Sequence, residues 1–516
     1  MLRPIDPLSA LRKTGGMSFS APGVYVEEVP RGPRPIEPLA TSVTAFVGRA
    51  VRGPVDRAVA VGDMAGFESV FGALTVDSGL GYGVRAFFAN GGRSAVIVRV
   101  DDGGATAQVD LGGGLVVEAV GPGSWANGLV VGVSHPSPDE AAAAASVQGL
   151  ATGDDIFTLW LTLDGHTELF PHVTLVDGPR RLDAVLQAST LARVRSPLTT
   201  TRPAPGNYPV STPGADGQVP AVDAYVSGAG EKRGITALDD VDLVNLLVLP
   251  PASPDIALPD GVWAAALAYA QQRRAFLIVD PPPGMPGSDI PDWLVGVGLT
   301  GAAARNAAIY YPRVDQRDPL SGGAVRSFAP SGAVAGVYAR MDAARGVWKA
   351  PAGLEAALAD VVGPSVVLTD PENGDLNRVG VNAIRAIDRV GTVVWGARTL
   401  RGADAHADEY KYVPVRRLAL HLEESVIRSL DWTVFEPNGE PLWARIRQVV
   451  GDFMQQMFRQ GAFAGAAPRE AYVVKCDAET TTPADIAGGV VEVLVGFAPL
   501  KPAEFIIFKV RTRAAP

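Results

Sequence analysis

Short, continuous apolar runs alternate with helix-like stretches over residues 43–102 and again over residues 221–395. The runs are TAFVGRA and SAVIVRV in the first part and VNLLVLP, AFLIVDPPP and AAIYYPRV in the second. Apolar strands without a polar face are typical of a parallel sheet that helices cover on both sides. Helices are expected near residues 65–71, 84–89 and 263–273 and from about residue 293. The pattern therefore predicts one α/β core built from two separated parts of the chain.

The intervening residues 103–220 have a different pattern of apolar and polar residues. Gly-rich and Thr-rich turns separate strands in which apolar and polar residues alternate, such as IFTLWLTL at 156–163. The end of the segment is rich in proline and has few charged residues. We expect a mostly β domain, inserted into the α/β core and placed on its outside.

Residues 396–516 are expected to form a last α+β unit with two amphipathic helices, near 416–430 and 442–459. In the second helix an apolar face carries Leu442, Ile446, Val449, Phe453 and Met457. A polar face holds Arg445 and Arg459, which could contact an acidic partner weakly; an ordinary solvated helix face is an equally open interpretation. The chain then closes with a separate apolar strand at 503–512.

The N-terminal residues 1–42 are predicted to be an arm and a tether. Residues 21–29, APGVYVEEV, alternate β-prone and acidic residues as a short exposed strand does. Four prolines between residues 30 and 42 should keep the following segment extended, with a reach of roughly 40 Å at about 3.1 Å per residue. A strand on such a tether need not pair with its own domain.

Composition limits the function further. Of the 516 residues 47% are hydrophobic and 19% are charged, and the net charge of −10 argues against nucleic acid as the main partner. The single cysteine, Cys476, cannot form an internal disulfide, which suits a reducing cytoplasm. The N-terminus lacks a signal-peptide core, and no apolar run approaches the roughly 20 residues that span a bilayer, so membrane insertion is not expected.

Strings that match catalytic motifs by letters lack the neighbouring secondary structure or partner residues that those motifs require. We therefore predict no catalytic, cofactor-binding or metal-binding residues. The string GVGLTG at 296–301 matches a dinucleotide fingerprint by letters, but it follows an expected helix start rather than a strand. The five histidines include no pair at the helical spacing that chelates a metal. No Gly-x-Ser-x-Gly elbow occurs, and Asp280, followed by three prolines, has no obvious partner histidine.

An ordered set of short strings runs through most of the sequence. They are PGVYVEE (22–28), FESVFG (67–72), FFANGG (87–92), WGARTL (395–400), YVPVRRL (412–418), EES (423–425), FEPN (435–438), GAF (461–463), KCD (475–477) and KPAEF (501–505). In these strings the chain resembles the tail sheath family of contractile phages and related injection systems. The resemblance is most specific from residue 395 onward.

This resemblance implies a split α/β core similar to the subtilisin layout but without its triad. It also implies six-fold discs stacked around an inner tube, with both terminal arms donated to neighbouring subunits. The expected partners are copies of the chain itself, an inner tube protein, and baseplate and terminal cap proteins. Assembly is expected in the bacterial cytoplasm, as part of a phage tail or a related particle that could be released from the cell.

The residues expected to pair with adjacent subunits form two strands. They are Val24, Tyr25, Val26, Glu27, Glu28 and Val29 in the N-terminal arm and Phe505, Ile506, Ile507, Phe508, Lys509 and Val510 in the C-terminal arm. Two other classes stay open at this stage. A static tube or shell protein would polymerise in one geometry only, and an α/β-hydrolase-like enzyme would act as a compact monomer.

Overall fold

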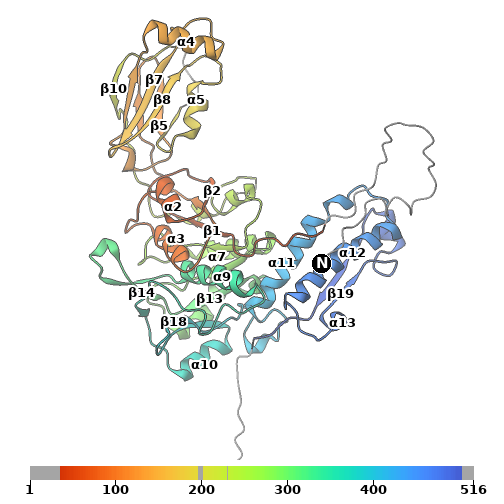
Figure 1. The fold of residues 1–516 in the computed structure, drawn as a ribbon. Helices are drawn as coiled ribbons and strands as arrows, with labels where there is room; N and C mark the ends of the chain where they lie inside the picture. Colours follow the sequence, from red (N-terminus) through yellow and green to blue (C-terminus); the bar gives the residue numbers. More distant parts are fainter. Residues whose placement is uncertain (1–34, 196–200, 229, 503–516) are drawn as a thin grey trace, which may run out of the picture.

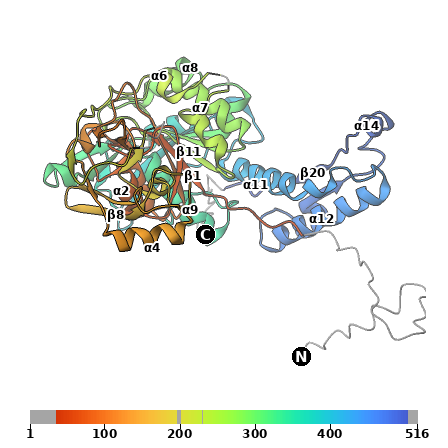
Figure 2. The same cartoon turned by 90° about the horizontal axis from the view of Figure 1, so that it is seen from above.

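The computed structural model describes residues 35–195, 201–228 and 230–502. The described residues form three units, shown in Figure 1. An α/β core lies in the middle, a β-rich unit projects from it at the top, and a helical unit extends to the right. Seen from above, the helical unit stands clear of the core, and helix α11 runs between the two (Figure 2).

The core is an eight-stranded mixed sheet. Its strand order is β18-β17-β13-β12-β11-β1-β3-β2. The six central strands run parallel, and the edge strands β2 and β18 pair antiparallel to their neighbours. In sheet order the bounds are Gly391–Val394, Val381–Ile387, Ala307–Tyr311, Phe276–Val279, Leu246–Val248, Thr44–Gly48, Ala95–Arg99 and Ala58–Val61.

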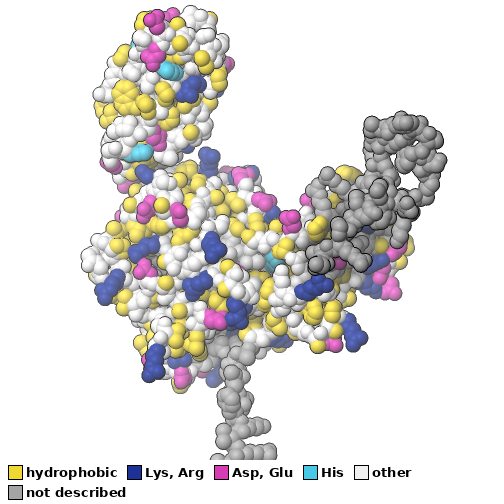
Figure 3. All heavy atoms as spheres, viewed as in Figure 1, with side chains coloured by type: hydrophobic (Ala, Val, Ile, Leu, Met, Phe, Trp, Pro, Cys, Tyr) yellow, Lys and Arg dark blue, Asp and Glu magenta, His cyan; other side chains and the backbone are white. Residues whose placement is uncertain are grey.

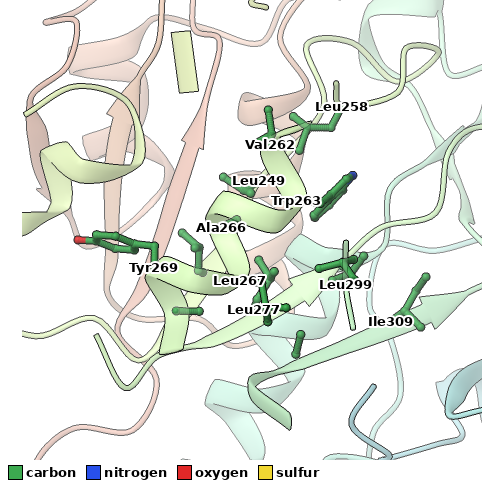
Figure 4. Packing of buried hydrophobic residues seen from close by; sticks show 14 of the residues in the cluster. Leu249, Leu258, Val262, Trp263, Ala266, Leu267, Tyr269, Leu277, Leu299 and Ile309 are labelled. Carbon is green, nitrogen blue, oxygen red and sulfur yellow. The ribbon is translucent and has the colours of Figure 1, made fainter. Parts of the chain in front are cut away.

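Helices cover both faces of this sheet because its strands are apolar on both sides. In β12, Leu277 and Val279 face one hydrophobic cluster, while Phe276 and Ile278 face the other. On the first face lie α7 (Asp260–Gln272), α8 (Ile290–Gly296) and α10 (Asp370–Arg378), and Figure 4 shows α7 packed on the strands. On the second face lie α2 (Met64–Phe71), α3 (Gly79–Ala89) and α9 (Ser331–Arg345).

Helices α3 and α9 approach each other closely because glycines line the contact. A Cβ placed on Gly332 would lie 2.2 Å from the carbonyl oxygen of Gly83, and one on Gly336 would lie 2.4 Å from that of Phe87. Helix α9 is buried around most of its circumference, so its sequence has no polar stripe. This explains why the periodicity of the sequence did not predict it.

The β-rich unit holds two sheets packed face to face. The four-stranded sheet has the order β10-β6-β7-β8 and the three-stranded sheet the order β4-β5-β9, and one apolar cluster fills the space between them. Strand β7 shows the predicted alternation of buried and half-buried residues. The bounds of β4 to β10 are Gln108–Asp110, Val116–Ala119, Val130–Ser134, Phe157–Leu163, His166–Val173, Ala192–Val194 and Gly206–Pro209, with α4 at Pro138–Gln148 and α5 at Leu182–Val185.

The helical unit is built on α11 (Val413–Ser429) and α12 (Glu440–Arg459), which share one apolar cluster. After α12 follow α13 (Pro468–Ala471), β19 (Tyr472–Lys475), α14 (Pro483–Ala487) and β20 (Leu494–Phe497). A further small sheet of β14 (Val314–Arg317), β15 (Val325–Phe328) and β16 (Gly363–Pro364) lies on the core, and α6 (Val222–Tyr225) is a single turn.

Within the described residues, the predicted strands of the core and of the β-rich unit and the predicted long helices are confirmed, with shifted starts. The helix expected at 84–89 begins at Gly79, where the Ser78 side chain accepts a hydrogen bond from the Gly81 amide. The helix expected from 416 begins at Val413, because Pro414 fits the first turn, where no intrahelical amide is needed. All five residues of the predicted apolar face of α12 are buried.

Candidate assembly interface

The sheet of the helical unit has only two strands. β19 and β20 pair antiparallel, Tyr472 opposite Phe497 and Lys475 opposite Leu494, and no third strand joins either edge among the described residues. Half of the backbone amides and carbonyls of such a strand point away from its partner, so an open edge can pair with another chain. Val473 and Leu494 are each about half exposed on this sheet.

The two strands are held in place from one side. The ring of Phe463 lies 5.8 Å from that of Phe497 and 6.1 Å from that of Tyr472. The Tyr472 hydroxyl donates to Oε1 of Gln455 on α12 at 2.9 Å. A two-stranded sheet is marginally stable alone, but this one is preformed by its packing on α12.

Both predicted exchanged strands, 24–29 and 505–510, lie outside the described residues. The structure shows where the described chain begins and ends. The described chain ends at Pro502, five residues beyond the end of β20, and begins at Pro35. Ile36 is buried in the apolar cluster of the helical unit, where it contributes alongside Leu418 and Leu442.

A buried ion pair fixes the base of the N-terminal tether. The Asp342 carboxylate on α9 accepts hydrogen bonds from both terminal nitrogens of Arg417 on α11, at 3.0 and 2.6 Å. It also accepts one from the hydroxyl of Thr41, at 2.6 Å. Arg417 also donates to the Thr41 carbonyl at 2.8 Å and lies 4.6 Å above the ring of Tyr338. The three residues, called the clamp below, join the tether, the core and the helical unit.

The clamp binds part of the predicted tether to its own subunit. Ile36 is buried and Thr41 is hydrogen-bonded, so the described residues 35–42 do not form a free strap. The reach of roughly 40 Å expected for residues 30–42 stays a prediction, because residues 30–34 lie outside the described residues. Nothing in the sequence around Asp342 signalled the clamp, although Arg417 belongs to the YVPVRRL string.

The two arginines predicted to touch an inner tube differ in their surroundings. The Arg445 guanidinium lies 4.6 Å from the ring of Trp432, so a cation–π contact already holds it against its own subunit. Arg459, at the last position of α12, is exposed. On the face shown in Figure 3, lysine and arginine side chains are scattered rather than gathered into a stripe.

The residues considered for catalysis have structural roles in the described chain. Asp280 follows β12 and accepts hydrogen bonds from the backbone nitrogen of Ser331 at 2.9 Å and from its hydroxyl at 2.5 Å, which caps α9. Burial raises the pKa of Asp280 to about 6. The GVGLTG string spans the end of α8 and the turn after it, so no strand precedes it.

The described residues form neither a metal cluster nor a membrane-spanning helix. No three of their histidine, cysteine, aspartate and glutamate side chains lie together in a way that could hold a metal ion. Within the same residues, no helix has the length and apolar character required to cross a membrane. His172 lies within β8, and its Nε2 contacts Oε1 of Glu140 at 3.0 Å.

Comparison with solved structures shows that the fold is that of sheath proteins. The chain is 23% identical to the sheath of the extracellular contractile injection system PVC in its contracted state, with 96% of this chain and 98% of that chain covered and a TM-score of 0.58. It is also 23% identical to the contracted helical sheath of the anti-feeding prophage, with 96% and 99% covered and a TM-score of 0.58. The sheath tail protein of Listeria innocua is 13% identical, with 89% and 96% covered and a TM-score of 0.59.

Family models agree with this fold. The phage tail sheath protein central domain matches residues 241–400, and the phage tail sheath C-terminal domain matches residues 406–513. Together they span more than half of the chain, and the chain belongs to the phage tail sheath family. None of the curated protein sequences compared with it matches. The resemblance inferred from the sequence strings is thereby confirmed.

Proposed function

We propose that this protein is the sheath subunit of a contractile injection particle or phage tail, and that it acts by assembly rather than by catalysis. The observation that carries the proposal is the match to both sheath domains together with a sheath fold over 96% of the chain. The hydrogen bonds from Ser331 at the start of α9 to Asp280 support a structural role for this residue of the α/β core. The solved neighbours include sheaths described as contracted, which favours a subunit with two packings over a static tube.

The proposed link between subunits is the addition of strands to the β19–β20 sheet. Strand 505–510 of one copy and strand 24–29 of another would pair with its two open edges. Each added strand makes about three to five backbone hydrogen bonds, each worth roughly 0.5–1.5 kcal/mol net. Burial of its apolar side chains adds several kcal/mol at about 25 cal/mol per Å².

The clamp supports this link because it gives the strap a fixed base. Force applied to the N-terminal arm passes through Thr41 into the core and the helical unit at once. Subunits tied in this way can rotate as rigid bodies while the lattice stays connected.

Contraction then needs only a small gain in free energy for each subunit. A difference of a few kcal/mol, summed over many linked copies, provides large mechanical work, and the links make the transition cooperative. The proposed lattice consists of six-fold discs stacked around an inner tube. The solved structure of the anti-feeding prophage baseplate, itself six-fold symmetrised, agrees with that symmetry.

The proposed contact with the inner tube uses the exposed end of α12, where Arg459 meets an acidic surface weakly enough to release it. Arg445 contributes less, because it already lies over Trp432. Arg459→Glu should lower co-sedimentation of inner tubes with the sheath at low salt. Arg378→Glu, on the exposed face of α10, is the matched control. Equal loss in both variants would remove the tube contact from the proposal.

The proposed setting is a particle assembled in the bacterial cytoplasm, with a baseplate and a terminal cap bound at its ends. The test of the whole function is the removal of residues 18–29. The shortened protein should remain soluble and folded by circular dichroism but form no tubes in negative-stain electron microscopy. Removal of residues 1–16 alone, which lie before the matching strings, is the control and should leave tubes intact. Normal tubes from the first deletion would contradict the strap.

A further inference from the structure

The turn between α11 and α12 carries an apolar side chain that no other described residue covers. Phe435 is fully exposed and Val434 is 62% exposed, and the flanking Glu436 and Pro437 are exposed as well. We call residues 434–437 the knob. The backbone of Phe435 has a φ of +69°, an unfavourable conformation for a bulky L-residue. An apolar ring held outward at a conformational cost favours a functional role over chance exposure.

The knob is braced from both sides, so it is a preformed protrusion. The Val434 amide donates to the Asp431 carbonyl at 3.2 Å, and the Glu436 amide donates to the Thr433 carbonyl at 3.1 Å. On the far side, Asn438 accepts from Nε1 of Trp443 at 2.9 Å and donates to the Val490 carbonyl at 2.9 Å. A rigid protrusion loses little entropy when a partner binds it.

A pocket with aromatic and basic lining residues lies at the other end of the helix pair α11 and α12. Its volume is about 760 Å³, which is within the roughly 300–1,000 Å³ of typical ligand pockets. Tyr412 and Pro414 line it at the start of α11, and Gln460 and Gly461 line it just after α12. Because α12 has 20 residues at about 1.5 Å each, the knob and the pocket lie about 30 Å apart.

The pocket offers aromatic surface and positive charge. Trp348 and Trp395 contribute rings to its lining, and Trp395 is 38% exposed. The charged residues of the lining are Lys349, Lys501 and Arg345, the last of which is already paired with Glu355, and none of the lining residues is acidic. The knob carries the opposite sign in Glu436, with Asp431 close to it in the turn. Apolar and charged parts of the two surfaces are therefore complementary.

We propose that the knob of one subunit inserts into this pocket of a second copy of the chain. Such a contact joins two different surfaces of identical subunits, so it propagates from copy to copy and can close a ring or build a helix. It would act beside the exchanged strands, because it involves neither edge of the β19–β20 sheet. The inference rests on the proposed function, since it concerns contacts within the sheath polymer.

Cysteine cross-linking tests the contact directly, because the native Cys476 is buried. The full chain is assembled with Phe435→Cys, with Lys349→Cys or with both, and treated with a short bismaleimide. The double variant should give a ladder of covalent oligomers. A mixture of the two single variants should give dimers, and either single variant alone should give monomers.

Other results would overturn the contact. Dimers from Phe435→Cys alone would mean that two knobs meet. Polymers that form normally and yield no cross-link in the double variant would mean that the knob binds elsewhere or that residues after 502 fill the pocket. If the wild-type chain forms no polymer under any condition, the proposed function fails as well, so the two failures are distinguishable.

Charge exchange provides a second readout that does not depend on cysteine chemistry. Glu436→Lys and Lys349→Glu should each raise the concentration needed for polymer about tenfold, as expected for a lost interface anchor. An equimolar mixture of the two variants should assemble again, because each knob then finds a pocket of opposite charge. Val147→Ala, an exposed apolar residue of the β-rich unit, is the control and should change nothing. Failure of the mixture to assemble, with both variants folded, would reject the pairing.

Discussion

Removal of the charge on Asp342 should destabilise the joint between the core and the helical unit. In the Asp342→Asn variant the guanidinium of Arg417 stays buried, with only 3% of its side chain exposed, and loses its ionic partner. Breaking one side of a buried ion pair typically costs about 3–5 kcal/mol, because an uncompensated charge remains in the interior. This is a large part of the roughly 5–15 kcal/mol that holds a domain folded.

The same helix offers a matched control. Glu355 accepts both bonds from one nitrogen of Arg345 on α9, at 2.7 and 2.9 Å, but the two side chains are 55% and 50% exposed. Exposed pairs contribute about 0–1 kcal/mol. Glu355→Gln should therefore change the free energy of unfolding by less than about 1 kcal/mol.

Urea denaturation of the variants, followed by far-ultraviolet circular dichroism, measures the difference. The first unfolding transition should move to clearly lower urea in Asp342→Asn and stay near the wild-type position in Glu355→Gln. Replacing both partners by apolar residues, Asp342→Leu with Arg417→Met, should recover part of the loss, because no charge is then left buried. Equal, small shifts in the two single variants would refute the clamp as a stabilising joint.

Three further predictions follow from the packing and the titration of buried groups. Burial, together with Arg417, lowers the pKa of His421 from 6.5 to about 4, so the folded state binds fewer protons than the unfolded state between these pH values. About 3 kcal/mol of stability should therefore be lost as the pH falls from 6.5 to 4. In urea titrations at several pH values, His421→Leu should remove this dependence of stability on pH. Gly336→Ala should lower the melting temperature strongly, because the Cβ of the alanine would lie 2.4 Å from the Phe87 carbonyl oxygen. Gly374→Ala on α10, which has open space around it, should leave the melting temperature unchanged or raise it. Phe497→Ala should weaken sheath assembly more than Val367→Ala, an exposed change elsewhere, as judged by pelleting, because Phe497 positions β20 against Phe463.

The central α/β elements could be predicted from local sequence because each carries its own signal. Strands such as β12 are continuously apolar, and α12 shows a clear 3.6-residue period with all five predicted core positions buried. Where starts were missed, a cap residue or a proline of the first turn lay outside the apolar pattern, as at Ser78 and Pro414.

Features that depend on distant residues could not be predicted. Helix α9 is apolar or small on nearly all sides, so its periodicity is weak, and only its glycine contacts with α3 reveal its place. The clamp joins positions 41, 342 and 417, which no local pattern connects. The same holds for the pocket, whose walls come from six separate stretches of chain.

The division of the chain at residues 42, 102, 220 and 395 stays a prediction, as do the exchanged strands. The sequence could suggest those strands because an apolar segment beyond a stiff tether has no neighbour along the chain. The structure adds a two-stranded sheet whose edges are open among the described residues, which is the acceptor that we propose for them.

The most direct test of this account is a cryo-electron microscopy map of the polymer formed by the full chain. It should show each β19–β20 sheet extended to four strands, with residues 24–29 and 505–510 supplied by two neighbouring copies. A map in which both terminal strands fold onto their own subunit, with no contact to another copy, would contradict it.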